Sequence, residues 1–403
     1  MGSIKRGITT ILKKHHYWRH AGFDELSELY IGMMFRSFAV SMIGIFIPLY
    51  LLDLGFTVVD ILSVIAWYFT LRIGANYLAG HVVARYGPKH AILLSYVFQI
   101  LTLAFFLTLP FYRWPLILVA IIWSISNSLF WVAYHVNFSK IKHTDHGGKE
   151  LGTINIVSRI GYAIGPIIGG TVATFFGPQY AFLVATVFLF AGLIPLLSSH
   201  EQVTSGRRLD IRKVKLRRIW PDVVTYASLY IDDIANGYYW PLYMSLFILS
   251  GFAFAKLGGM MSVSMVVGML TAWILGKLTD RHHGRPLYQM GRLGDAAIHF
   301  ARPFIKATSV ALGSNILYEL FAVAVNLPLY KGLYDHCDDW DEHRAEYITV
   351  LEVISSVFLA LVSWIAVFAL GFMDIKIVLQ LIFLSAGIMC CVAVLTERFK
   401  ALD

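Results

Sequence analysis

Long apolar runs, separated by short polar turns rich in Gly and Pro, dominate the chain. Most are about 20 residues long, the length that an α-helix needs to cross roughly 30 Å of hydrocarbon. They lack the strict alternation of membrane β-strands. Because a spanning helix closes its backbone hydrogen bonds internally, the pattern predicts an all-α membrane protein with twelve transmembrane helices. The predicted spans are Leu29–Leu52, Val58–Ala79, Ala91–Leu109, Pro115–Phe138, Leu151–Phe175, Tyr180–Leu197, Val223–Leu249, Leu257–Leu275, Leu287–Arg302, Ile305–Tyr330, Tyr347–Leu370 and Ile375–Leu395.

The ninth predicted span is short and carries Arg292, Asp295 and His299, with Gly291 and Gly294 among them. Two interpretations fit this segment: a loop that does not span the membrane, or an interrupted span of the kind that lines transporter cavities. The second fits the internal repeat described next.

One polar break, Ser198–Pro221, divides the chain into two halves that resemble each other. Gly55-Phe56 corresponds to Gly251-Phe252, and Gly80 corresponds to Gly276, each pair 196 positions apart. An internal repeat of this length predicts two related six-helix bundles joined by a hinge. The predicted divisions are a basic N-terminal segment (1–24), a first bundle (25–199), a basic linker (200–220), a second bundle (221–397) and a C-terminal tail (398–403).

The composition agrees with a membrane protein, because 58% of the residues are hydrophobic and only 14% are charged. The net charge of +8 could suggest a nucleic-acid partner, but the basic residues gather in the termini, the linker and alternate loops. This positive-inside bias predicts a multi-pass protein of the cell membrane, inner or plasma, with both termini cytoplasmic and no nucleic-acid partner. The expected partners are the lipid bilayer and a small-molecule or lipid substrate, and we expect a monomer. The apolar stripe Ile4, Ile8, Ile11 and Leu12 fits either a helix on the membrane surface or a frayed basic tail.

The sequence contains no pattern that indicates an enzyme, a metal site or a cofactor. Cys337, Cys390 and Cys391 offer neither a disulfide framework nor metal-ligand spacing. Nucleophile and base motifs and cofactor-binding loops are also missing from the sequence. We therefore expect no catalytic residues, no metal and no cofactor.

A glycine-led basic loop follows the second span of each half. Two six-span halves, a charged hinge and this repeated loop resemble the major facilitator superfamily over essentially the whole chain. The resemblance implies a cytoplasmic gate motif, although Ala84 stands where the first copy would have its acidic residue. The implied gate residues are Gly80, Arg85 and Gly87 in the first copy and Gly276, Asp280, Arg281, Gly284 and Arg285 in the second.

The fifth span carries a second pattern, which resembles the glycine motif of proton-linked exporters in that superfamily. Its residues are Gly152, Gly161, Gly165, Pro166, Gly169 and Gly170. Glycines allow helices to approach backbone to backbone, so ordinary helix packing is an equally open interpretation. The fourth span lacks the Arg of typical drug exporters, which argues against a standard multidrug antiporter.

Ionisable side chains inside spans are costly and normally face a cavity or a partner. Those of the first half are basic, and most of those in the second half are acidic, so we expect the two sets to face each other across a central cavity. The predicted cavity or substrate-binding residues are Arg36, Arg72, Asn76, Asn127, Trp131, Tyr134, Asn155, Arg159, Tyr239 and Asn315. The predicted proton-coupling or ion-pair residues are Asp232, Asp233, Arg292, Asp295, Glu319 and Glu352.

The resemblance implies a secondary active transporter that moves a small or amphiphilic solute by alternating access. A proton gradient is the expected energy source, and export by antiport is the direction that the glycine motif favours. In one interpretation the Arg residues bind an anionic group while Asp232, Asp295 or Glu319 carries a proton; in the other, these residues form fixed ion pairs that close a gate. A flippase for an anionic lipid or glycolipid is an alternative, and an intramembrane enzyme and a sensor that does not transport are further ones.

Overall fold

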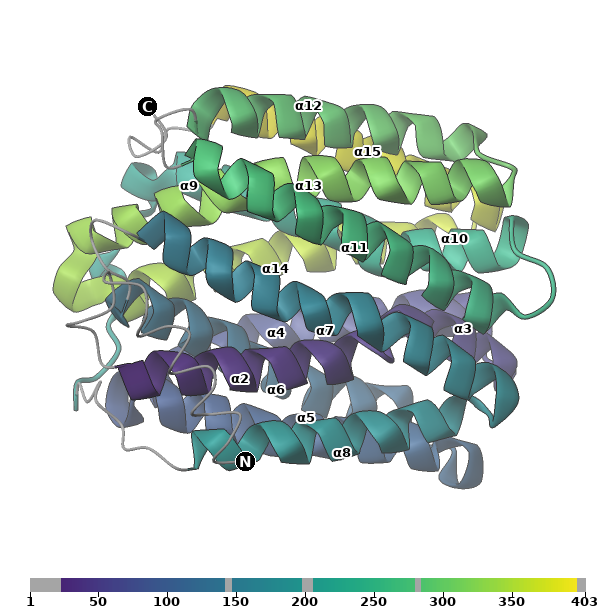
Figure 1. Ribbon diagram of the computed structural model, residues 1–403, viewed down its shortest axis with the longest axis horizontal. Helices are drawn as coiled ribbons and strands as arrows, with labels where there is room; N and C mark the ends of the chain where they lie inside the picture. The colour runs from purple at the N-terminus through teal and green to yellow at the C-terminus, as the bar shows by residue number, and fades with distance from the viewer. Residues whose placement is uncertain (1–22, 142–146, 198–205, 280–283, 397–403) are drawn as a thin grey trace.

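The computed structural model describes residues 23–141, 147–197, 206–279 and 284–396. Within these ranges all regular secondary structure is helical, and the helices run side by side in two groups (Figure 1). The predicted N-terminal surface helix and the C-terminal tail lie outside the described residues.

The first group fills the lower part of Figure 1. It consists of α2 (Phe23–Ser41), η2 (Gly44–Phe46), α3 (Ile47–Asp53), α4 (Val58–Tyr86), α5 (Pro88–Tyr112), α6 (Leu116–Ile141), α7 (Gly147–Phe175) and α8 (Pro178–Leu196). The second group consists of η3 (Ile211–Lys213), α9 (Leu216–Ile234), η4 (Ala235–Tyr239), α10 (Trp240–Phe247), α11 (Ala253–Thr279), α12 (Gly284–Ala301), η5 (Arg302–Phe304), α13 (Thr308–His336), η6 (Cys337–His343), α14 (Arg344–Ala369) and α15 (Ile375–Thr396).

Nine helices in the described part of the chain are long and apolar enough to cross a membrane. The remaining predicted spans fall on α7, on α9 with η4 and α10, and on α12. The short ninth span is therefore a continuous helix, α12, which packs against α13 and α15. The all-α fold with two six-helix bundles agrees with the prediction from the sequence.

Local sequence signals set the turns between these helices. Thr57 and Asp60 exchange hydrogen bonds with each other's backbone N–H groups at the start of α4, forming a capping box. Gly87 and Gly177 adopt φ values of +92° and +112°, and each is followed by a proline that begins the next helix. A glycine tolerates this backbone conformation, and a proline fits the first helical turn.

The first and seventh spans are both interrupted, which the hydrophobic pattern does not predict. The first breaks between α2 and α3 around Gly44, and the seventh passes through the π-helix η4, which contains Gly237. Pro48 and Pro241 each lie four residues after one of these glycines, and a proline ring removes a ladder hydrogen bond and clashes with the carbonyl four residues earlier. The two breaks therefore arise from the same cause at corresponding places in the two halves.

The two groups meet mainly along α7 against α11 and α4 against α14. Glycines allow this approach: a methyl group on Gly170 would overlap the carbonyl oxygen of Phe254, and one on Gly258 would overlap that of Pro166. Within the first group, Gly161 and Gly165 lie against the backbone of α2, and Gly169 lies against that of Met42, directly after α2. The fifth-span motif is thus a packing surface on two sides of α7. Gly152 lies in α7, but its surroundings are outside the described residues.

Candidate transport site

A cavity of about 440 Å³ lies between the two groups, beside the interruptions in the first and seventh spans. Residues of α2, α4, α6 and α7 line it from one side, and residues of α9, η4, α11 and α13 line it from the other. The charged residues in its wall are Arg72, Arg159, Asp233 and Glu319. The aromatic residues are Tyr68, Phe69, Trp131, Tyr162, Tyr230, Tyr238, Tyr318 and Tyr330, and the amides are Asn127, Asn236 and Asn326.

An ion pair joins the two halves at one wall of this cavity. Arg159 Nη1 on α7 donates to Glu319 Oε2 on α13 at 3.0 Å, and both side chains are largely buried. Gly268 on α11 leaves the necessary space, because a methyl group there would collide with both partners. The guanidinium of Arg159 is therefore already engaged by a carboxylate.

A second ion pair joins the halves at another wall. Arg72 Nη2 on α4 donates to Glu352 Oε2 on α14 at 2.9 Å. The other oxygen of Glu352 accepts hydrogen bonds from the hydroxyl groups of Tyr226 at 2.9 Å and Tyr230 at 2.6 Å. Asn76 adds a bond to the backbone carbonyl of Glu352 at 3.0 Å, which fixes α4 against α14.

Aromatic side chains bound the cavity on both sides. Towards the linker, the ring of His135 on α6 stacks on Tyr330 of α13, and its Nδ1 lies 2.7 Å from the hydroxyl of Tyr334. At the opposite end, the ring of Trp123 contacts that of Tyr238 edge-on, with 5.8 Å between the ring centroids. Each contact joins one half to the other.

Asp233 differs from the other charged residues of the wall. Its side chain is exposed although it lies inside the helical assembly, because it faces the cavity. Among the described residues, the structure gives it neither a hydrogen bond nor an ion pair. The preceding residue, Asp232, is 2% exposed and points into the second group of helices.

Five of the residues predicted for the cavity do not line it. Arg36 is buried inside the first half, 3.8 Å above the centre of the Phe130 ring, with a bond to Asn127 at 3.5 Å. Tyr134 stacks on the same Phe130. The other three are bonded between helices: Asn76 to Glu352 and Ser356, Tyr239 to Ser363, and Asn315 to Trp240. The side chain of Asn155 lies outside the described residues.

Three of the predicted ion-pair residues, Asp232, Arg292 and Asp295, lie in a separate cluster within the second half and do not line the cavity. Asp232 binds Arg292 Nη1 at 3.0 Å and His299 Nε2 at 2.7 Å. Arg302 lies 3.3 Å from the other nitrogen of His299 and donates to Asn236, which lines the cavity. Both carboxylate oxygens of Asp295 are buried, with no hydrogen-bond partner among the described residues.

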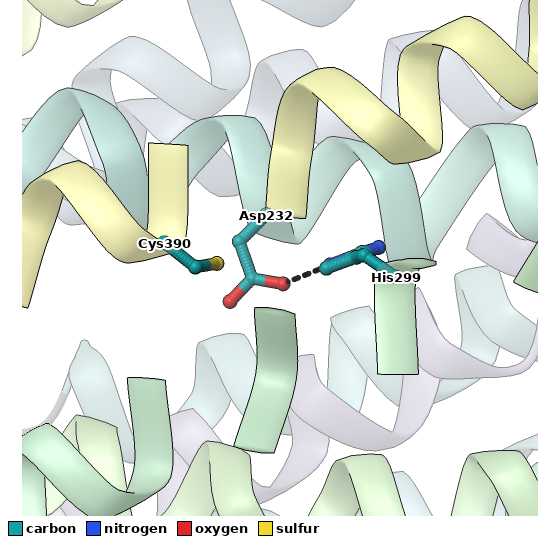
Figure 2. Close-up of side chains that lie close together, drawn as sticks. All are labelled: Asp232, His299 and Cys390. Carbon is teal, nitrogen blue, oxygen red and sulfur yellow. Dashed lines mark hydrogen bonds and ion pairs between the residues drawn. The ribbon is translucent and has the colours of Figure 1, made fainter. Parts of the chain in front are cut away.

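Figure 2 shows Asp232, His299 and Cys390, which lie close enough together to suggest a metal site. However, Arg292 Nη1 is 3.0 Å from Asp232 and 3.7 Å from the sulfur of Cys390. A cation bound there would meet this guanidinium at short range in a buried setting, where like charges repel strongly. The donor set therefore fits an internal ion pair better than a metal.

Much of the aromatic wall was not predicted from the sequence, although a signal for it exists. Tyr318, Ala322, Asn326 and Tyr330 recur at every fourth position of α13 and all line the cavity. Such spacing places side chains on one face of a helix. A search for polar and aromatic residues at that spacing would have found this stripe.

The first copy of the predicted gate motif lies where the linker crosses the helix ends. A methyl group on Gly80 would overlap Thr349 of α14 and touch Leu209 of the linker, so this glycine permits a close approach of the two halves. The backbone N–H of Arg207 donates to the carbonyl of Ala84 at 3.3 Å, close to Arg85 near the end of α4. In the second copy, Asp280 and Arg281 lie outside the described residues, Gly276 falls within α11, and Gly284 and Arg285 begin α12.

Two helical bundles with a charged cavity between them are an arrangement typical of secondary transporters. The chain belongs to the Major Facilitator Superfamily, because the family model of that name matches residues 29–337. Transport of a solute across a membrane by a multi-pass protein, rather than catalysis, is the activity of this family.

Similar proteins support this family and fold. The chain is 22% identical over 257 residues to the uncharacterized MFS-type transporter YcaD of Escherichia coli O45:K1 (strain S88 / ExPEC), a match that covers 62% of this chain. It is 21% identical over 263 residues to the protein of the same name from strain O139:H28 (E24377A / ETEC). The chain spans 65% of the length of these relatives.

A solved structure matches over nearly the whole chain. The crystal structure of the human organic anion transporter MFSD10 (TETRAN) superposes with a TM-score of 0.67 over 93% of this chain and 98% of that protein. At 12% sequence identity, this likeness shows the shared fold.

Proposed function

We propose that this protein is a proton-coupled secondary transporter that carries an amphiphilic organic solute through the central cavity. The observation that carries the proposal is that two ion pairs join the halves. Arg159 pairs with Glu319, and Arg72 pairs with Glu352. Both lie beside the space that a solute would occupy.

Alternating access requires the two halves to rock against each other, so each opening step must separate one of these pairs. Separating a buried ion pair leaves two uncompensated charges, at a cost of about 3–5 kcal/mol. A proton bound to Glu319 or Glu352 neutralises the carboxylate and removes most of the attraction. Protonation on one side of the membrane would thereby favour the separated state, and proton release on the other would favour re-pairing.

We further propose that the chain resides in the cell membrane with both termini cytoplasmic and that it works as a monomeric exporter by antiport, without a bound cofactor. The basic residues of the linker and the loops on its side support this orientation. The close packing of α7 against both α2 and α11 supports a role for the fifth span as a rigid surface along which the neighbouring helices slide during transport.

Transport in sealed vesicles tests the proposal. Purified protein would be reconstituted into liposomes, a pH gradient imposed, and the movement of rhodamine 6G, a cation, and carboxyfluorescein, an anion, followed by fluorescence. We expect at least one dye to move in response to the gradient only when protein is present.

Two variants sharpen this test. Glu319→Gln should abolish the response to the gradient, whereas Asp53→Asn, an exposed carboxylate at the end of α3, should leave it unchanged. Equal responses in the wild type and Glu319→Gln would refute proton coupling through this pair.

A further inference from the structure

The charges that line the cavity do not balance. Arg159 is paired with Glu319, and Arg72, also in the wall, is paired with Glu352. Each of these pairs is formally neutral. Asp233 is left as an unpaired carboxylate facing the cavity, within the part of the chain that the structure describes.

Aromatic rings and soft side chains share the cavity with Asp233. They include Trp131, Tyr162, Tyr238 and Tyr318, together with the thioether of Met265. The faces of such rings attract cations electrostatically. A carboxylate within an aromatic wall is therefore a complementary site for an organic cation.

We propose that the transported solute is an organic monocation with an apolar or aromatic body and that Asp233 binds its positive charge. This inference rests on the proposed function and names the class of substrate. The cavity of about 440 Å³ suits one drug-sized molecule, since ligand pockets typically range from about 300 to 1,000 Å³.

An anionic solute fits this geometry less well. It would have to displace Glu319 from Arg159 or Glu352 from Arg72, and it would share the cavity with the carboxylate of Asp233. Each displacement would expose a further negative charge beside the first. The arginines therefore act in this site as partners of the protein's own carboxylates.

Two probes of nearly equal shape and opposite charge test the inference. Tetraphenylphosphonium and tetraphenylborate both carry four phenyl rings around one central atom. Equilibrium dialysis against the purified full-length protein in detergent, corrected with protein-free micelles, would measure the binding of each. We expect saturable binding of tetraphenylphosphonium without competition from tetraphenylborate, and about tenfold or more weaker binding by Asp233→Asn.

Controls separate a local effect from misfolding. Asp233→Glu should retain most of the affinity, Asp53→Asn should bind like the wild type, and size-exclusion profiles should match across all variants. Tighter binding of tetraphenylborate, saturable binding of neither probe, or unchanged affinity in a folded Asp233→Asn protein would overturn the inference.

The two proposals can fail separately. Proton-driven movement of an anionic dye that requires Glu319 and ignores Asp233→Asn would leave the transport proposal standing and refute the cation site. Binding of tetraphenylphosphonium that depends on Asp233, with no response to a pH gradient in vesicles, would support the site and refute the coupling.

Discussion

Arg159 and Glu319 are 160 positions apart in the sequence and 3.0 Å apart in the structure, one in each half of the molecule. Together with Arg72 and Glu352, 280 positions apart, they link the bundles directly across the space between them. The charges inside these spans thus hold the two bundles together, and the alternating access proposed above would have to separate them.

Removing both members of the Arg159–Glu319 pair should destabilise the protein by less than the sum of the two single removals. Arg159→Met or Glu319→Gln leaves a partner without its charge complement, whereas the double variant leaves none. We expect each single substitution to lower the unfolding free energy by about 3 kcal/mol, and the double variant to lose less than the sum. Thermal unfolding in detergent provides the measurement, and additive losses would show that the pair is not coupled.

Glu352→Gln should loosen the side of the cavity that faces the linker. Arg72, Tyr226 and Tyr230 all bind this carboxylate, so its neutralisation weakens contacts among α4, α9 and α14 at once. The reporter is a cysteine introduced into the cavity by Asn127→Cys, in a protein whose three natural cysteines have been replaced. Its alkylation by a membrane-impermeant maleimide should accelerate about tenfold, which corresponds to a shift of about 1.4 kcal/mol in the opening equilibrium.

The control for this labelling experiment is Asp339→Asn, an exposed carboxylate near the same end that contacts His336 within its own half. Its labelling rate should match that of the parent protein. If Glu352→Gln is labelled no faster than this control, the hydrogen bonds of Glu352 to Arg72, Tyr226 and Tyr230 do not hold the cavity closed on this side.

The sequence predicted the fold well because membrane crossing imposes a strong and local constraint. A run of about 20 apolar residues identifies a span whatever its neighbours are. The glycines of α7 were also identifiable, since their spacing places them on the packing faces of one helix.

The orientation of each helix was much harder to predict. Arg36 and Arg72 both lie within spans, yet Arg72 reaches the cavity and Arg36 packs over Phe130 inside one bundle. Asp232 and Asp233 are neighbours in the chain, but successive residues of a helix project about 100° apart, so they face opposite environments. Such rotations depend on long-range packing that one sequence does not reveal.

Gly169→Ala should disturb the packing of α7 against the backbone just after α2. A methyl group there would overlap the carbonyl oxygen of Met42, which belongs to the backbone and is not able to swing aside. Overpacking of this kind typically costs about 1–3 kcal/mol. Gly74→Ala provides the matched control: it lies in α4 with nothing within 4 Å of the added carbon, so it should leave the melting temperature unchanged or slightly raised. Equal melting temperatures for the two variants would argue against close packing at Gly169.

Asp232→Asn should destabilise the second half far more than Asp295→Asn, although the two carboxylates are equally deep in the bundle. Asp232 accepts from Arg292 at 3.0 Å and lies 2.7 Å from His299, so its neutralisation leaves a buried guanidinium uncompensated, at a cost of about 3–5 kcal/mol. The oxygens of Asp295 have no hydrogen-bond partner in the described structure, so an amide there loses no bond. Chemical denaturation of both variants in the same detergent would compare them. A larger loss for Asp295→Asn would mean that Asp295, and not Asp232, is the essential counter-charge of Arg292.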